Sequence, residues 1–174
     1  STSHDRESVQ QDHDAGQLLA LEINAEIHEL EVPMSDANAI IREIEDAYRH
    51  YIEVFNRSDA AGFVGCYAHP HTMLSGEQGM VVVNTEADHH RVYQGMAAAL
   101  EKSNWGRSEI DRLQTWPYSK SLAQLVADVT RYKKDGSVLE KLRATYTFRN
   151  EKGAWKILAF SLIEAPFSGP GISR

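Results

Sequence analysis

The feature that most constrains the fold is a change in hydrophobic periodicity near residue 109. Before it, apolar residues recur at helical spacing, whereas after it come four long segments rich in Val, Thr, Tyr, Trp and Leu. The turn sequences Lys134-Asp135-Gly136 and Asn150-Glu151-Lys152-Gly153 separate the last three segments. We expect the four segments to form β-strands, at Ile110–Tyr118, Leu122–Tyr132, Val138–Arg149 and Trp155–Glu164. The pattern predicts an α+β fold in which a curved antiparallel sheet packs against three N-terminal helices.

The three helices of this domain follow from apolar stripes and capping residues. Apolar residues from Ile40 to Phe55 fall on one face and predict a long helix, which Ser35 or Asp36 would cap. Ser58 or Asp59 would then cap a short second helix. Thr85 with Asp88 resembles a capping box for a third helix, whose stripe runs from Val92 to Leu100.

Two short strands are expected between the second and third helices, around His71–Ser75 and Met80–Val83. The domain therefore spans residues 36–165, with an irregular tail at 166–174. Residues 1–14 are polar and aperiodic, and we interpret them as disordered or as an artificial addition. Residues 15–35 form an amphipathic helical extension that docks on its own domain, on a dimer mate or on a different protein.

Composition excludes several classes of protein. The net charge is -7, and nine acids against Arg6 give residues 1–37 a net of -8, which leaves the rest of the chain near +1. A nearly neutral domain argues against nucleic-acid binding. No apolar run reaches the roughly 20 residues that span a bilayer, and no signal peptide is visible. The single cysteine, Cys66, is expected to be a buried structural thiol in a cytoplasmic protein, with a reactive thiol as the alternative.

Several short motifs appear in a recognisable order. Phe55-Asn56-Arg57-Ser58-Asp59 follows a long helix, and Gly153-Ala154-Trp155-Lys156-Ile157 opens the closing strand. This order resembles the nuclear transport factor 2-like superfamily, which includes SnoaL-like cyclases and ketosteroid isomerase. The resemblance implies a cone whose open end holds a pocket for a hydrophobic small molecule, and a homodimer formed through the sheet.

The resemblance also bears on catalysis. Aligned with ketosteroid isomerase, Tyr51 falls on the tyrosine that donates a hydrogen bond to the oxyanion, and Ser75 falls on the general-base aspartate. A serine cannot abstract a proton from carbon as a carboxylate does. Steroid-type isomerisation at Ser75 is therefore not expected.

A pair of histidines precedes Ser75. His69 and His71 alternate along a strand and share a face with Met73 and Ser75, so all four are candidate pocket residues. His71 is the candidate general acid or base. The alternative is that each histidine is half exposed or hydrogen-bonded to backbone.

Metal binding lacks support in the sequence. A metal site needs three or four ligands, and no histidine follows His90. His89 lies on the polar side of its helix stripe and is expected to face solvent. We therefore expect neither a metal nor a cofactor, and the sequence contains no nucleotide-binding motif.

Asp128 and Trp116 complete the candidate site. Asp128 is a lone carboxylate among apolar strand residues, so it either orients His71 and Tyr51 in the pocket or forms a salt bridge with Arg143 or Arg131. Trp116 either lines the pocket mouth or packs in the core or a dimer interface.

Two hypotheses for the function remain open. In the first, Tyr51, His71 and Asp128 perform cofactor-independent acid–base chemistry, such as isomerisation, dehydration, cyclisation or hydrolysis. In the second, the same fold is a ligand-binding or dimerisation module without catalysis.

Overall fold

The computed structural model describes residues 34–76 and 79–163. The predicted segments 1–14 and 166–174, and all but the last two residues of 15–35, lie outside these ranges. Within them the chain forms the helices α2 (Met34–Asn56), α3 (Ala60–Gly65) and α4 (Glu86–Lys102). The strands are β1 (Tyr67–Ser75), β2 (Gly79–Val83), β3 (Trp105–Pro117), β4 (Leu122–Lys133), β5 (Val138–Glu151) and β6 (Ala154–Ile163).

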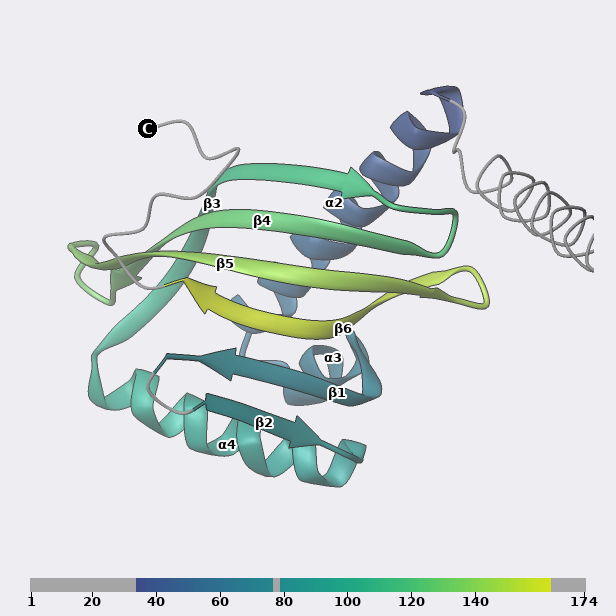
Figure 1. Ribbon diagram of the computed structural model, residues 1–174. Coiled ribbons are helices and arrows are strands. Elements are labelled where there is room, and N and C mark those ends of the chain that lie inside the picture. The colour runs from purple at the N-terminus through teal and green to yellow at the C-terminus, as the bar shows by residue number, and fades with distance from the viewer. Residues whose placement is uncertain (1–33, 77–78, 164–174) are drawn as a thin grey trace, which may run out of the picture.

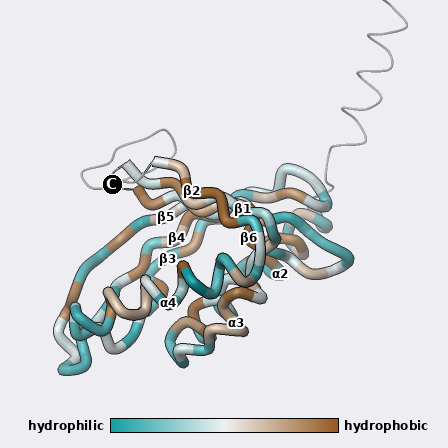
Figure 2. The backbone as a smooth tube through the Cα atoms, turned by 90° about the horizontal axis from the view of Figure 1, so that it is seen from below, coloured by the Kyte–Doolittle hydropathy of each residue, from teal (hydrophilic) through white to brown (hydrophobic). Residues whose placement is uncertain are grey.

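The strands form one curved sheet in the order β2-β1-β6-β5-β4-β3 (Figure 1). All neighbours are antiparallel except β1 and β6, which run parallel. The helices lie on one side of this sheet, as the view from below shows (Figure 2). The predicted α+β architecture, including the antiparallel meander, is therefore confirmed.

Two strands begin several residues before their predicted starts. Strand β1 begins at Tyr67, four residues early, because its pairing with β6 extends beyond the β1–β2 hairpin to Tyr67 and Ile157. Strand β3 begins at Trp105 and not at Ile110, because its pairing with β4 already starts at Trp105 and Lys133. A Cβ atom on Gly106 would lie 2.9 Å from the Lys133 carbonyl oxygen, so glycine permits this close approach of two strands.

Helix α2 begins at Met34, so Ser35 and Asp36 lie within its first turn and do not precede it as caps. The caps predicted for the other two helices are present. The Asp59 carboxylate accepts a hydrogen bond from Gly62 N at 2.9 Å, and Thr85 Oγ1 accepts one from Asp88 N at 3.1 Å.

Asn56, at the end of α2, fixes the helix to the sheet. Its side-chain Nδ2 donates to the Ser108 carbonyl at 2.9 Å, and its Oδ1 accepts from Ser108 N at 2.8 Å. Ser108 is buried in β3, so the Asn56 amide replaces a missing strand partner there. In this turn, Asn56 therefore binds β3, whereas Asp59 caps α3.

The core lies between the helices and the sheet. Ile44 and Tyr48 of α2 are completely buried against residues such as Leu125, Phe148 and Ile157. Cys66 follows α3, half-buried, with its Sγ 3.3 Å from the Gly62 carbonyl oxygen. Burial raises the pKa of this thiol to about 11, which fits the structural thiol that the sequence predicts.

Candidate functional site: a tyrosine-lined cavity and a histidine cluster

A cavity of about 920 Å³ lies between the helices and the sheet. This volume is in the upper part of the range for small-molecule pockets. Tyr51 of α2, Phe63 of α3 and Met96 of α4 form its helical wall. Its apolar lining from the strands consists of Met73, Leu142, Phe160, Leu162 and Ile163, and Tyr67 and Tyr146 line it as well.

Buried tyrosine hydroxyls form the uncharged polar part of this lining. Tyr67 donates a hydrogen bond to the Tyr51 hydroxyl at 3.4 Å, and Tyr48 donates to Tyr146 at the same distance. The rings of Tyr51 and Tyr146 join the two pairs, with centroids 5.9 Å apart. We refer to Tyr48, Tyr51, Tyr67 and Tyr146 as the tyrosine group.

All four phenols remain protonated in this environment. Burial raises the pKa of each of them above the ordinary value for tyrosine. The positive charge of Arg131, which also lines the cavity, acts in the opposite direction on Tyr48 and Tyr51. The tyrosine group therefore presents neutral O–H donors beside a guanidinium, a combination suited to an oxygen atom that carries partial negative charge.

The charged lining residues lie where the β5–β6 pairing ends, at Arg143 and Ile163. Their carboxylates are engaged. Glu140 accepts from Arg131 at 2.8 Å, and Asp111 accepts from Thr130 Oγ1 at 2.6 Å. Asp128 accepts from Arg112 at 3.1 Å and from Arg143 at 2.9 Å.

Strand register separates Asp128 from the tyrosine group. Leu125 pairs with Tyr146, which pairs with Phe160, so these side chains share the face that the helices cover. Asp128 pairs with Arg143 and has the opposite parity, so its side chain leaves the sheet on the other face. Asp128 therefore borders the cavity where the β5–β6 pairing ends, and it forms the salt bridge with Arg143 that is the alternative expectation for this residue.

The other predicted site residues divide into two groups. Tyr51 and Met73 line the cavity, and Asp128 of β4 borders it. His69, His71, Ser75 and Trp116 are not among its lining residues. Trp116 is 43% exposed on β3. The structure thus brings Tyr51 and Met73 together but does not place His71 beside Asp128.

Sequence reasoning missed Tyr67, Tyr146 and Arg131. Tyr67 starts β1, before the strand that the sequence predicts around His71–Ser75. Tyr146 alternates with Ala144 and Phe148 on the buried side of β5, and this alternation was the available signal. Arg131 pairs with Glu140 across two strands, a register that hydropathy does not reveal.

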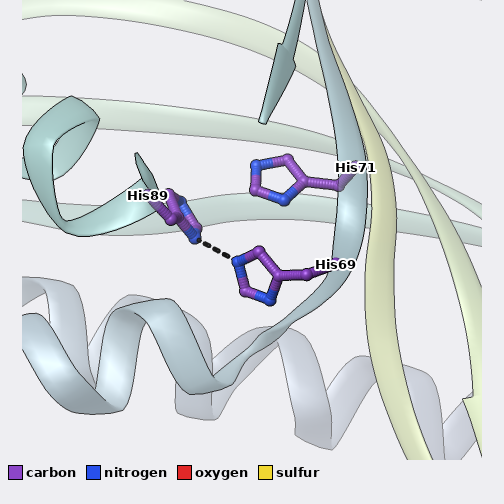
Figure 3. Close-up of side chains that lie close together, drawn as sticks. All are labelled: His69, His71 and His89. Atoms are coloured by element: carbon purple, nitrogen blue, oxygen red, sulfur yellow. Dashed lines mark hydrogen bonds between the residues drawn. The ribbon is translucent and has the colours of Figure 1, made fainter. Parts of the chain in front are cut away.

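His69 and His71 instead form a cluster with His89 of α4, and the three rings approach one another (Figure 3). The His69 Nε2 and His89 Nδ1 atoms are 3.2 Å apart. His71 and His89 are almost completely inaccessible, at 1% and 0% exposure. The prediction that His89 faces solvent is wrong, because α4 packs this side chain against the rings of Phe63 and Tyr67.

Solved structures share this architecture. A protein of unknown function from Pseudomonas putida described as NTF2-like has a TM-score of 0.60 at 18% identity, over 76% of this chain and 90% of that one. A ketosteroid isomerase-like protein from Erwinia carotovora atroseptica has a TM-score of 0.52 at 19% identity, over 71% and 95%. At such identities the likeness shows the fold alone, which is NTF2-like.

A protein-family model gives a more specific assignment. The model for NTF2-like proteins of the DUF6841 family matches residues 42–164, and the chain belongs to this family. The nuclear transport factor 2-like resemblance seen in the sequence is therefore confirmed. No curated protein matches the chain. No helix in residues 34–76 or 79–163 is long and apolar enough to cross a membrane.

Proposed function

We propose that this protein binds an apolar small molecule that carries a carbonyl or similar oxygen acceptor. The observation that carries the proposal is the cavity of about 920 Å³, whose lining combines apolar side chains with the buried phenols of Tyr51, Tyr67 and Tyr146. Burial of the apolar part supplies affinity, and the phenols hydrogen-bond the oxygen and fix its orientation.

Binding without turnover is the form of this function that the site supports best. Acid–base chemistry on such a molecule needs a base beside the donor. Ser75 is not a carboxylate, and Asp128 leaves the sheet on the other face. Glu140 is paired with Arg131, and Asp111 is hydrogen-bonded by Thr130. A carboxylate held by a guanidinium is a weaker base than a free one. Tyr51 therefore acts as a binding donor in this proposal.

The position of the ligand is tested by filling the cavity. Met73 lines it from β1, so Met73→Trp places an indole in the space that the ligand would occupy. Binding of 2-acetylnaphthalene, an apolar ketone, is measured by equilibrium dialysis. We expect the affinity to fall at least about tenfold in this variant, since the apolar contacts of the ligand are lost.

Met80→Trp is the matched control, because Met80 is on the adjacent strand β2 and is 65% exposed. This variant should bind the ketone as the unsubstituted protein does. Equal affinities in all three proteins would overturn the proposal, because binding would then occur outside the cavity. The same holds if the unsubstituted protein does not bind the ketone.

A further inference from the structure

Three histidines converge from two elements that are distant in sequence. His69 and His71 come from β1 and His89 from α4, and one ring nitrogen from each lies within 4.8 Å of the other two. The ring centroids of His71 and His89 are 4.4 Å apart (Figure 3). The His-x-His pair alone offers two imidazoles, which are too few for a metal site. The fold brings His89 beside them as the third.

Two of these rings are buried with unsatisfied nitrogens. His71 Nε2 and His89 Nε2 have no hydrogen-bond partner among the residues that the structure describes. Buried polar atoms almost always have partners, so two such atoms in adjacent rings point to a missing ligand. A cation that accepts lone pairs would satisfy His71 Nε2, and His89 would bind the same cation through Nδ1, the nitrogen that faces His69 Nε2.

A hydrogen bond to the backbone fixes which ring nitrogen of His71 carries the lone pair, as is usual for metal ligands. His71 Nδ1 lies 3.1 Å from the Ala68 carbonyl oxygen, which can only accept, so Nδ1 carries the proton. The lone pair is then on Nε2. A histidine that donates its other N–H to a carbonyl is the usual outer-shell arrangement at metal sites.

The charge state also suits a metal. Burial lowers the pKa of His71 to about 4 and that of His89 to about 3, and it lowers the pKa of His69 as well. All three rings are therefore neutral at pH 7, which is the form that coordinates metals. The negative charges of Glu86 and Glu151 act on His69, the least buried of the three, and favour a cation there, whereas Lys156 opposes it.

We propose that His69, His71 and His89 bind one divalent transition-metal ion, with zinc as the best match for three imidazoles, and that this ion joins β1 to α4. Nitrogens around a tetrahedral zinc lie roughly 3.4 Å apart, so small ring movements would close the present arrangement. Three protein ligands leave the fourth position to water. The site is distinct from the cavity, although Tyr67 and Phe63 contact both.

The test measures Co²⁺ and Zn²⁺ binding to the full chain after treatment with a chelator. We expect one tetrahedral Co²⁺ per chain, seen by its visible absorption, and a rise in Tm with Zn²⁺. His69→Gln should weaken binding by at least about tenfold, because even the loss of a group that only orients a ligand has that effect. His69 is the variant of choice because it is only partly buried, and circular dichroism checks that the variant folds.

His90→Gln is the matched control, since His90 is adjacent to His89 on α4 but outside the cluster. It should bind metal and gain Tm as the unsubstituted chain does. His4, His13 and His28 are the same in all three proteins, so any binding by them cancels in the comparison. Equal binding by the His69→Gln and His90→Gln chains, or no Co²⁺ binding by the unsubstituted chain, would overturn the proposal.

Discussion

At the scale of single residues, the surroundings of each side chain decide its chemistry. Asp128 and Glu140 form ion pairs with arginines, and the ring of Tyr51 packs against that of Tyr48. Asp128 is held by two arginines, Arg112 and Arg143. The hydrogen bond from Arg143 holds its pKa below the ordinary value, with further contributions from the charges of Arg143 and Arg112, while burial opposes them. This carboxylate is therefore a structural link between β3, β4 and β5.

A pH dependence follows from the lowered pKa of Asp128. The unfolded chain binds this proton more readily, so the stability from the ion pairs is present above about pH 4 and is lost as pH falls through the folded pKa. Asp128→Asn should lower the free energy of unfolding by about 1 kcal/mol at pH 7. It should also make that free energy fall less steeply between about pH 5 and 3.

Urea unfolding at several pH values measures this effect. Asp46→Asn is the control, because the Asp46 side chain is 80% exposed and lies 3.9 Å from its arginine partner. It should leave the pH profile unchanged. If Asp128→Asn has the same pH profile as the unsubstituted protein, the ion pairs do not contribute as described.

At the scale of elements, the turn after α2 holds the helices against the sheet. The Asn56 side chain makes two hydrogen bonds to the backbone of the buried Ser108, and Asp59 caps α3. Tyr51 and Phe63, which lie on either side of this turn, reach the cavity because both helices are fixed in this way.

Asn56→Ala should therefore lower the stability of the protein more than the loss of an asparagine at a helix end usually does. It removes both bonds and leaves a buried backbone N–H and carbonyl without their partner, so we expect a loss of about 2–3 kcal/mol in unfolding free energy. Asn150→Ala is the comparison, since Asn150 accepts a single bond from Gly153 N in an exposed turn. Chemical denaturation should show a clearly smaller loss there, and equal losses would contradict the role given to Asn56.

At the scale of the whole molecule, local patterns predicted the fold well and the site only in part. The stripe from Ile40 to Phe55 and the turns at Gly136 and Gly153 define helices and hairpins, because these signals lie within a few residues. The meeting of His71 with His89, and the separation of Asp128 from Tyr51, depend on how α4 and β4 pack against β1 and α2. These relations involve residues 18 and 77 positions apart in the sequence, a distance that periodicity does not cover.

The expected homodimer stays a prediction, as do the helical extension and the catalytic set of Tyr51, His71 and Asp128. What the fold does provide is a cavity of about 920 Å³ with apolar side chains and neutral phenols in its wall. The central claim is that these phenols recognise an oxygen atom on an apolar ligand, and that the apolar walls alone do not account for the affinity.

The most direct test compares two ligands of nearly equal shape, 2-acetylnaphthalene and 2-ethylnaphthalene, which differ in one carbonyl oxygen. Tyr51→Phe removes a cavity hydroxyl, and the exposed Tyr118→Phe is the control. We predict that equilibrium dialysis of Tyr51→Phe shows about two- to tenfold weaker binding of the ketone and unchanged binding of the hydrocarbon. Equal changes for both ligands, or no change for either, would contradict recognition by the tyrosine group.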